Sequence, residues 1–301
     1  MERIGIDLGG TKIEISILDA KGELSLRRRV ATPAGDYPAT LEAISRLVAD
    51  VERERGTQCS VGIAMPGALS LATGLVKNSN STCLNGKPFK TDIEARLGRG
   101  VRMANDANCF ALSEAVDGAA RGAAVVFGVI LGTGVGGGLV VNAEIVTGAN
   151  AIAGEWGHNP LPLTAEEAPP LPRCYCGREG CVEAFLSGPS LAADHERATG
   201  ERIDPAQIAA RAATGDAGCE ATLCRYERRL ARALAVVINI VDPDVIVLGG
   251  GLSNLQRLYG NVPSLWTSVV FSDALRTRLV APMHGDSGGV RGAAWLWGGP
   301  K

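Results

Sequence analysis

Residues 4–18 read IGIDLGGTKIEISIL, and this stretch decides the fold. Isoleucines and leucines alternate with glycine or polar residues on both sides of a central Gly-Gly-Thr-Lys. This pattern is typical of a strand, a glycine turn and a second strand, with the β-branched residues that strands favour. The stretch FGVILGTGVGGGLVV at 127–141 can be placed over it position by position. Two strand-turn-strand units in one chain indicate a duplicated domain.

Further strands and helices surround these two units. Apolar residues at helical spacing predict a helix from Tyr37 to about Arg55, and a Pro-rich surface loop is expected near 160–172. Three strands joined directly, followed by helices between later strands, favour an α/β protein with mixed sheets. The remaining predicted strands lie at about 23–32, 60–67, 101–106 and 244–250, and the helices at 107–122, 182–198, 205–214, 217–241 and 288–297.

The length of 301 residues suits two domains facing each other across a cleft. We expect a smaller N-terminal α/β domain at 1–120 and a larger α/β domain at 121–287. The C-terminal helix at about 288–298 is expected to pack back onto the first domain.

The composition excludes several classes of protein. With 46% hydrophobic and 21% charged residues, the chain can bury a core, and its net charge of -2 gives no general attraction to nucleic acid or membranes. Neither a signal peptide pattern nor an apolar run of about 18 residues is present in the sequence. We expect a cytoplasmic protein with a small-molecule partner.

Three glycine turns follow predicted strands: GGTK at 9–12, GTGVGGG at 132–138 and GGG at 249–251. The N–H groups of such turns can converge on an anion, although one turn alone is equally a tight hairpin. Neither a dinucleotide fingerprint nor a Walker motif fits the spacing. The turns predict a phosphate clamp, with side-chain oxygens of Asp7, Thr11 and Thr133 near the phosphates or a metal ion. The other candidate phosphate-binding residues are Gly9, Gly10, Lys12, Gly132, Gly134, Gly249, Gly250 and Gly251.

The motifs DLGGTK, ANDAN, LGTGVGGG, EWGH, CYCGREGCVE and VIVLGGG, in this order, resemble the ROK family of sugar kinases and repressors over nearly the whole chain. The resemblance implies a two-domain actin-like ATPase fold, which is hexokinase-like and ribonuclease H-like, with duplicated mixed sheets around a cleft. It also implies ATP and Mg²⁺ as cofactors. Longer phrases at 76–89, 105–120, 242–254 and 284–297 resemble the bacterial fructokinases of the family, which also act on mannose. Members are often homodimers, so the resemblance also implies a second copy of the chain as a partner.

Asp106 ends a predicted strand and begins a predicted helix. A carboxylate there can take the proton of an attacking sugar hydroxyl, but Asp at a helix start also serves as a simple N-cap. By resemblance Asp106 is the catalytic aspartate, and Asn105 binds sugar hydroxyls. The other sugar-binding residues that the resemblance implies are Glu155, His158, Glu183, Asn80 and Gly67 of the Pro66-Gly67 turn.

Cys174, Cys176 and Cys181 form C-x-C-x4-C, which one imidazole completes to a Cys3His zinc site. A redox pair would need C-x-x-C. His158 is the candidate fourth ligand, which the resemblance supports, while His195 and His284 are expected to be solvated or packed. The five other cysteines, expected to be small buried hydrophobic residues, are Cys59, Cys83, Cys109, Cys219 and Cys224.

The predicted zinc site is closed by four protein ligands and therefore structural. It would fix Glu155 and Glu183 and leave the second nitrogen of His158 free to donate to a sugar hydroxyl. The stretch from His158 to Cys174 is longer than in many family members, so its path over the sugar stays open.

These observations together predict an ATP-dependent kinase that phosphorylates a free hexose at the 6-hydroxyl, fructose first and mannose second. The alternative within the family is a glucokinase or N-acetylglucosamine kinase. A sugar-responsive repressor would need a DNA-binding module, for which we expect no room before the first glycine turn at residue 9. A sugar-binding protein without activity is the last alternative.

Overall fold

The computed structural model describes residues 2–19, 21–165, 167 and 169–298. The chain forms two compact units: Met1–Gly122 with Gly138–Ala153 and Met283–Lys301, and Ala123–Gly137 with Gly154–Pro282. The sequence-based division assigned 138–153 and 283–287 to the second domain, whereas their contacts place them in the first unit. The reason is visible at Gly138, where a Cβ atom would lie only 2.7 Å from the carbonyl oxygen of Ala107.

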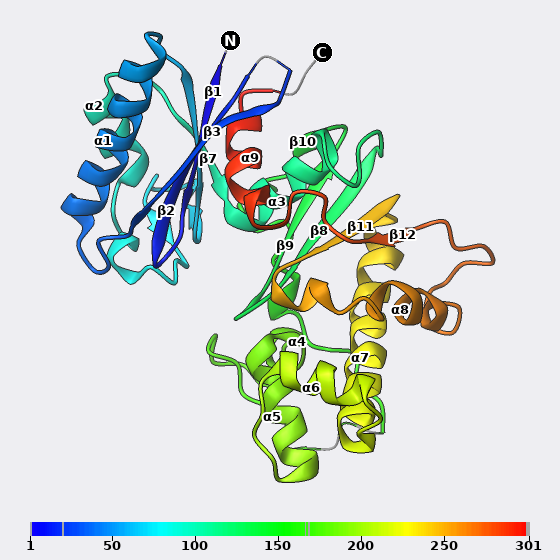
Figure 1. The fold of residues 1–301 in the computed structure, drawn as a ribbon. Coiled ribbons are helices and arrows are strands. Elements are labelled where there is room, and N and C mark those ends of the chain that lie inside the picture. The colour runs from blue at the N-terminus through cyan, green and yellow to red at the C-terminus, as the bar shows by residue number, and fades with distance from the viewer. Residues whose placement is uncertain (1, 20, 166, 168, 299–301) are drawn as a thin grey trace. The chain divides into compact units, whose positions relative to one another are not determined.

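The first unit contains a five-stranded mixed sheet (Figure 1), whose strand order is β3-β2-β1-β4-β7. Strands β1, β2 and β3 pair antiparallel, and β1, β4 and β7 pair parallel. The inward side chains of β1 and β2 are isoleucine and leucine, buried on the core side. The strands are β1 (Arg3–Leu8), β2 (Lys12–Leu18), β3 (Leu24–Ala31), β4 (Ser60–Met65) and β7 (Arg102–Asn105), with a separate small pair of β5 (Ala68–Leu69) and β6 (Val76–Lys77).

The second sheet has the order β10-β9-β8-β11-β12, the same spatial pattern. Its strands are β8 (Val125–Leu131), β9 (Val135–Val141), β10 (Glu144–Ile145), β11 (Val245–Gly249) and β12 (Arg278–Val280). Adding 123 to the bounds of β2 gives those of β9, and adding 123 to Leu8 at the end of β1 gives Leu131 at the end of β8. The predicted duplication and α/β class are therefore confirmed.

Four helices cover the two faces of the first sheet: α1 (Tyr37–Arg55), α2 (Phe89–Leu97), α3 (Asp106–Val116) and α9 (Gly288–Trp295). Helix α1 begins at its N-cap Asp36, whose side chain accepts from the N–H of Ala39, and ends at Gly56 with a φ of 67°. Helices α1 and α2 lie on one face, and α3 and α9 on the other (Figure 1).

Paired glycines allow α9 to lie directly on the sheet. Gly5 of β1 and Gly62 of β4 are register partners, and a Cβ atom on either would come within 2 Å of a carbonyl oxygen of α9. Gly292 of α9 meets the backbone of Cys109 in α3 equally closely. This contact between distant parts of the chain brings the helix start at Gly288 close to the carboxyl end of β1.

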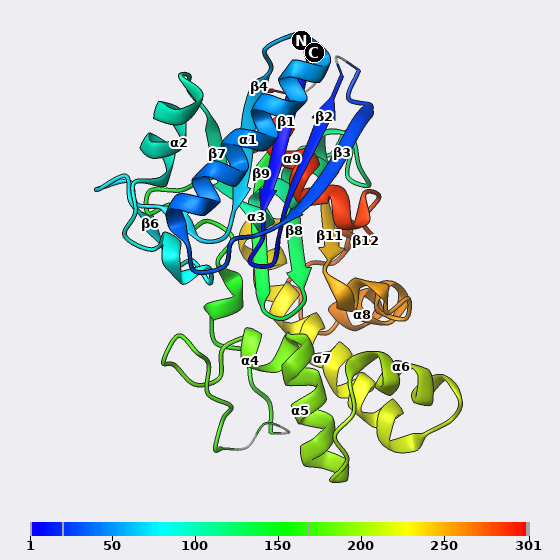
Figure 2. The ribbon, with the colours of Figure 1, turned by 60° about the vertical axis from the view of Figure 1, so that its left-hand side comes forward.

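In the second unit, the long helix α7 contacts α4, α5, α6 and α8 (Figure 2). These helices are α4 (Glu183–Leu186), α5 (Gly188–Thr199), α6 (Pro205–Ala213), α7 (Ala217–Val241) and α8 (Leu258–Trp266). The 3₁₀ helices in the described part of the chain are η1 (Thr82–Leu84), η2 (Trp156–His158), η3 (Gly251–Asn254) and η4 (Gly285–Ser287). Within the described residues, none of the helices is long and apolar enough to cross a membrane.

Two predicted helices have different bounds. The helix expected at 107–122 ends at Val116, because the carboxylate of Glu114 turns back to accept from the N–H of Ala119. The helix expected at 182–198 is broken at Ser187, which ends α4 and caps α5. Helices α2 and α8 and strand β12 were not predicted.

Candidate active site and metal centre

The first glycine turn joins β1 to β2 in the first unit. The N–H of Gly9 donates to the carbonyl of Lys12 at 3.0 Å, and the hydroxyl of Thr32 donates to the carbonyl of Gly9 at 2.7 Å. Gly10, Thr11 and Lys12 are exposed. The turn is thus fixed at its base while its tip stays open to a ligand.

Asp7 lies at the carboxyl end of β1, opposite Glu14 in the β1–β2 register. Burial raises the pKa of Asp7 to about 7, and the negative charges of Asp106 and Glu14 act in the same direction against the opposing Lys12. A Cβ atom on Gly289 would lie 3.0 Å from the Asp7 carboxylate, so the start of α9 closes over this side chain. A cation beside Asp7 would relieve the mutual repulsion of these carboxylates.

Asn105 and Asp106 stand at the junction of β7 and α3. Asn105 is the N-cap: its side-chain oxygen accepts from the N–H of Ala107 at 2.9 Å, and its amide donates to the carbonyl of Gly67 at 3.1 Å. Asp106 is the first helical residue; it is exposed, and its Oδ1 accepts from the same N–H at 2.8 Å. The N-cap role considered for Asp106 therefore belongs to Asn105. A carboxylate at this position is accessible to a substrate.

Asn80 and the Pro66-Gly67 turn belong to the same unit as Asn105 and Asp106. Gly67 has a φ of 78°, and a Cβ there would lie 2.4 Å from the carbonyl of Lys77, so the turn needs glycine. Asn80 and Gly10 line one pocket of about 230 Å³, so the structure brings these two predicted residues together. The pocket's other lining residues are Leu8, Thr32, Ala34, Gly35, Thr40, Ser81, Thr82, Cys83 and Leu84.

The second and third glycine turns meet in the second unit. The N–H of Gly132 donates to the carbonyl of Gly134 at 3.0 Å, and Thr133 at the tip is exposed. Gly250, between Gly249 and Gly251, has a φ of 79°, and a Cβ there would lie 2.4 Å from the carbonyl of Leu131 at the end of β8. Only glycine allows this approach of the two turns.

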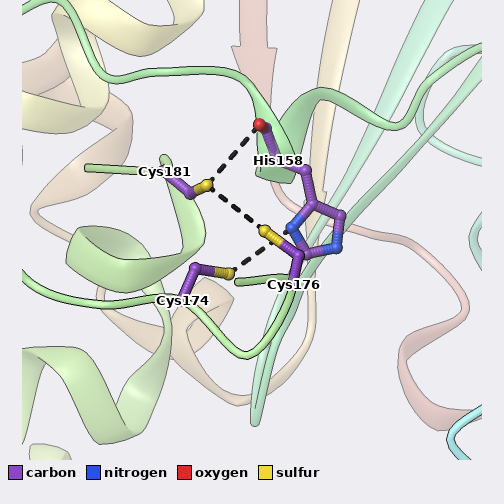
Figure 3. A group of neighbouring side chains, drawn as sticks. All are labelled: His158, Cys174, Cys176 and Cys181. Atoms are coloured by element: carbon purple, nitrogen blue, oxygen red, sulfur yellow. Dashed lines mark hydrogen bonds between the residues drawn. The ribbon is translucent and has the colours of Figure 1, made fainter. Parts of the chain in front are cut away.

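His158, Cys174, Cys176 and Cys181 converge in the second unit, as Figure 3 shows. Their ligand atoms all lie within 4.8 Å of one another; Cys174 Sγ is 3.6 Å from His158 Nδ1, and the Sγ atoms of Cys176 and Cys181 are 3.7 Å apart. A tetrahedral zinc with bonds of about 2.3 Å to sulfur places its ligand atoms about 3.7 Å apart. This donor set fits zinc in both chemistry and spacing.

The second nitrogen of His158 has a partner that the sequence analysis did not predict. Nε2 lies 3.1 Å from the hydroxyl of Tyr175, and the two rings meet edge to face at 5.2 Å. The expectation that this nitrogen is free is therefore wrong for this structure. Tyr175 lies between Cys174 and Cys176 and is 81% exposed; its place inside the C-x-C motif was the signal that could have identified it.

The two predicted carboxylates flank this cluster differently. Glu155 is exposed and precedes η2, whose Trp156 is fixed by donating to the carbonyl of Gly136 at 2.9 Å. Glu183 begins α4; one oxygen accepts from the N–H of Val135 at 2.8 Å, and the other lies 3.7 Å from Cys174 Sγ. Glu183 thus links the cysteine cluster to the second glycine turn.

The remaining histidines and cysteines lie outside the cluster. His195 is buried against the hydroxyl of Thr222 at 3.0 Å, and His284 contacts Asp117 at 3.0 Å, so both are packed. The expectation of burial holds for Cys59, Cys109 and Cys219, but Cys83 and Cys224 are only half-buried, because they lie near the surface of their units.

The duplicated sheets with glycine turns and carboxylates at their strand ends define the actin-like, hexokinase-like ATPase fold. The ROK family profile matches residues 3–299. An N-acetyl-D-glucosamine kinase of Salmonella paratyphi B is 41% identical over 296 residues, which cover 97% of this chain and 98% of that protein. The chain belongs to the ROK family, among its sugar kinases.

Solved structures agree with this assignment. A ROK hexokinase from Thermus thermophilus shares 30% identity with a TM-score of 0.86, covering 98% of this chain and 97% of that one. A ROK family glucokinase from Streptomyces griseus, solved with glucose and AMPPNP, shares 27% identity with a TM-score of 0.77, covering 98% and 99% of the two chains. The expected fructokinase branch does not appear among these similar proteins, and the first of them matches the N-acetylglucosamine kinase alternative instead.

Proposed function

We propose that the protein transfers the γ-phosphoryl group of ATP to the 6-hydroxyl of N-acetyl-D-glucosamine. The observation that carries the choice of sugar is the 41% identity to an N-acetyl-D-glucosamine kinase over 97% of the chain. This proposal replaces fructose as the first substrate. Glucose is the second candidate, because the Streptomyces glucokinase with bound glucose shares the fold and 27% of its sequence.

Asp106 is the proposed general base. Its exposed carboxylate at the start of α3 can accept the hydroxyl proton as the oxygen attacks phosphorus. Asn105 is also proposed to bind the sugar. One hydrogen of its side-chain amide group donates to the carbonyl of Gly67 and its side-chain oxygen accepts from the N–H of Ala107, so the second amide hydrogen is proposed to donate to a sugar hydroxyl. Asn80, beside the pocket at Gly10, is proposed to bind the same sugar.

The glycine turns are the proposed phosphate-binding elements. The exposed tips at Gly10–Lys12 and Thr133 offer backbone N–H groups and hydroxyls to phosphate oxygens, and Gly249–Gly251 lies against the second of these turns. Mg²⁺, when bound with ATP, would neutralise phosphate charge. The buried carboxylate of Asp7 fits a place beside that cation.

Zinc is the proposed structural metal of the cluster His158, Cys174, Cys176 and Cys181. The cluster would fix Glu155, three residues before His158, and Glu183, two residues after Cys181, for binding sugar hydroxyls. In this proposal the hydroxyl of Tyr175 orients the imidazole of His158 until sugar binds.

ADP release from Mg-ATP tests the proposal. The purified protein would be assayed with N-acetylglucosamine, glucose, fructose and mannose and with a blank without sugar. The highest kcat/KM with N-acetylglucosamine supports the proposal. A higher kcat/KM with fructose would favour the fructokinase branch, as the sequence motifs predicted. The absence of sugar-dependent ADP release would refute the kinase assignment.

A further inference from the structure

The loop at 159–173 leaves the cysteine cluster at His158 and returns to it at Cys174. Backbone hydrogen bonds from Leu161 to Gly180 and from Gly180 to Pro172 close its base. In the middle of this loop stands Glu167, whose side chain is only 2% exposed. A buried carboxylate needs compensating partners, so the contacts of Glu167 show what the loop is attached to.

Two groups of donors satisfy the Glu167 carboxylate. Oε2 accepts from both the N–H and the hydroxyl of Thr164 at 2.9 Å, which folds the loop onto itself. Oε1 accepts from Arg229 Nε at 3.2 Å and from Arg232 Nη2 at 2.7 Å, both on α7. Arg232 also donates through Nε to the carbonyl of Pro162 at 2.9 Å. The loop is therefore held on α7 by buried, charge-assisted hydrogen bonds.

Arg229 extends this attachment to the neighbouring helices. Its Nη1 donates to Asp194 of α5 at 2.8 Å, and its guanidinium lies over the ring of Phe185 in α4 at 5.1 Å. The hydroxyl of Tyr226, also on α7, donates to the carbonyl of Leu186 at 3.0 Å. One arginine thus joins the loop, α4 and α5.

Helix α4 begins with Glu183, which holds the N–H of Val135 at the second glycine turn. We propose that Glu167 is a positioning residue. It ties the loop to α7 directly and ties α4 to α7 through Arg229, and in this way it fixes the orientations of His158 and Glu183. A consequence of Glu167 for catalysis rests on the proposed sugar kinase function, whereas its consequence for the position of Glu183 does not.

Removing the carboxylate would leave Arg229 with Asp194 as its remaining carboxylate partner and would leave Arg232 without its Glu167 counter-charge. Both side chains are buried, with 8% and 12% exposed, so they cannot recover these bonds from water without moving. We expect the loop to detach first and α4 to shift with Arg229.

The test compares Glu167→Gln with Glu196→Gln by hydrogen exchange of backbone amides. Glu196 on α5 is the control for the loss of one glutamate charge. Its side chain is 45% exposed and lies 4.0 Å from the side chain of Arg202, so the same substitution there removes a charge at the surface. In Glu167→Gln, the amides of Thr164 and Val135 should exchange at least about tenfold faster, the change expected for one lost charge-assisted hydrogen bond. The control should alter neither. Faster exchange at Thr164 alone, or at neither amide, would overturn the link to Glu183.

Kinetics of the same variants test the functional consequence. If the proposed function holds, Glu167→Gln should raise the KM for sugar about tenfold while kcat and the KM for ATP change less than about twofold. Loss of stability alone, with an unchanged KM for sugar, would refute a positioning role. Arg232→Lys keeps the charge but loses the bond to Pro162, and should give the same changes more weakly if Glu167→Gln does not fold.

Discussion

Asp106 is exposed on a helix start that Asn105 caps. Both side chains accept from the N–H of Ala107, Asn105 at 2.9 Å and Asp106 at 2.8 Å, and Asn105 also donates to the carbonyl of Gly67. The two bonds of Asn105 do not depend on Asp106. Asp106 is therefore the residue whose replacement should separate catalysis from folding.

For Asp106→Asn we expect kcat to fall by about 10²–10⁴, the usual contribution of a general base, while sugar binding is retained. The asparagine keeps the size and the acceptor oxygen but cannot take a proton. Calorimetric titration with sugar and steady-state kinetics measure the two effects separately. Unchanged turnover would refute the assignment of Asp106.

Asp7 makes the stability of the fold depend on pH. Its folded-state pKa is raised to about 7, mainly by burial, from an ordinary value of 3.8. The folded protein therefore loses stability as the pH rises from about 4 to 7, where the unfolded chain has already released this proton. Asp7→Asn removes this loss, while it should impair turnover because the carboxylate is proposed to serve the phosphates.

We expect the Asp7→Asn variant, without Mg²⁺ and nucleotide, to gain about 4 kcal/mol in unfolding free energy at pH 8 and almost nothing at pH 4. Urea unfolding at the two pH values checks this. An equal gain in unfolding free energy at pH 8 and pH 4 would show that the folded protein does not raise the pKa of Asp7.

Among single residues, the sequence allowed the chemistry of the strand ends to be predicted but not the local partners. The candidate role of Asp7 follows from its place at a strand end before a glycine turn, whereas the role of Asn105 came from the family resemblance. The contact between His158 and Tyr175 and the bond from Val135 to Glu183 do not, because they depend on how the loops fold back.

At the level of elements, the approach of the second and third glycine turns depends on Gly250. Its positive φ and the nearby carbonyl of Leu131 exclude a side chain. Gly215 has a φ of 96° with nothing within 4 Å of its Cβ position, which makes it a matched control for backbone strain alone.

Gly250→Ala should cost about 2–4 kcal/mol of stability and Gly215→Ala about 1 kcal/mol, since only the first adds a steric clash to the left-handed strain. Urea unfolding measures both. Equal losses would mean that the turn at 249–251 can move away from β8.

The cysteine cluster should hold about one zinc per chain, and Cys181→Ser should abolish it. Cys181 is 1% exposed, so its loss should also lower the melting temperature. Cys224→Ser, a half-buried cysteine outside the cluster, is the control and should retain zinc. A metal-free protein that stays stable and active would contradict the zinc assignment.

Helical periodicity predicted α1, α6 and α7 well because each has a clear apolar face and a capping residue at its start. It failed at 182–198, where Ser187 ends one helix and caps the next, and at α8, which contains Pro263. The local signal at 182–198 was Ser187-Gly188-Pro189, in which serine caps a helix and proline fits its first turn, and the helical pattern was extended across it.

For the whole molecule, the duplication could be predicted because both strand-turn-strand units keep the same spacing. The return of the C-terminal helix to the first unit was expected, but the place of residues 138–153 and 283–287 in that unit was not, since it depends on contacts between distant parts of the chain. The choice of sugar was also beyond the motifs, because the residues expected to bind hydroxyls are shared by the kinases considered.

The most direct test of the central claim is a competition assay with limiting ATP and equal concentrations of N-acetylglucosamine, glucose, fructose and mannose. Chromatography of the sugar phosphates gives the ratios of kcat/KM in one mixture. We predict N-acetylglucosamine 6-phosphate as the main product. A product consisting mainly of fructose 6-phosphate or another hexose phosphate would contradict the proposed substrate.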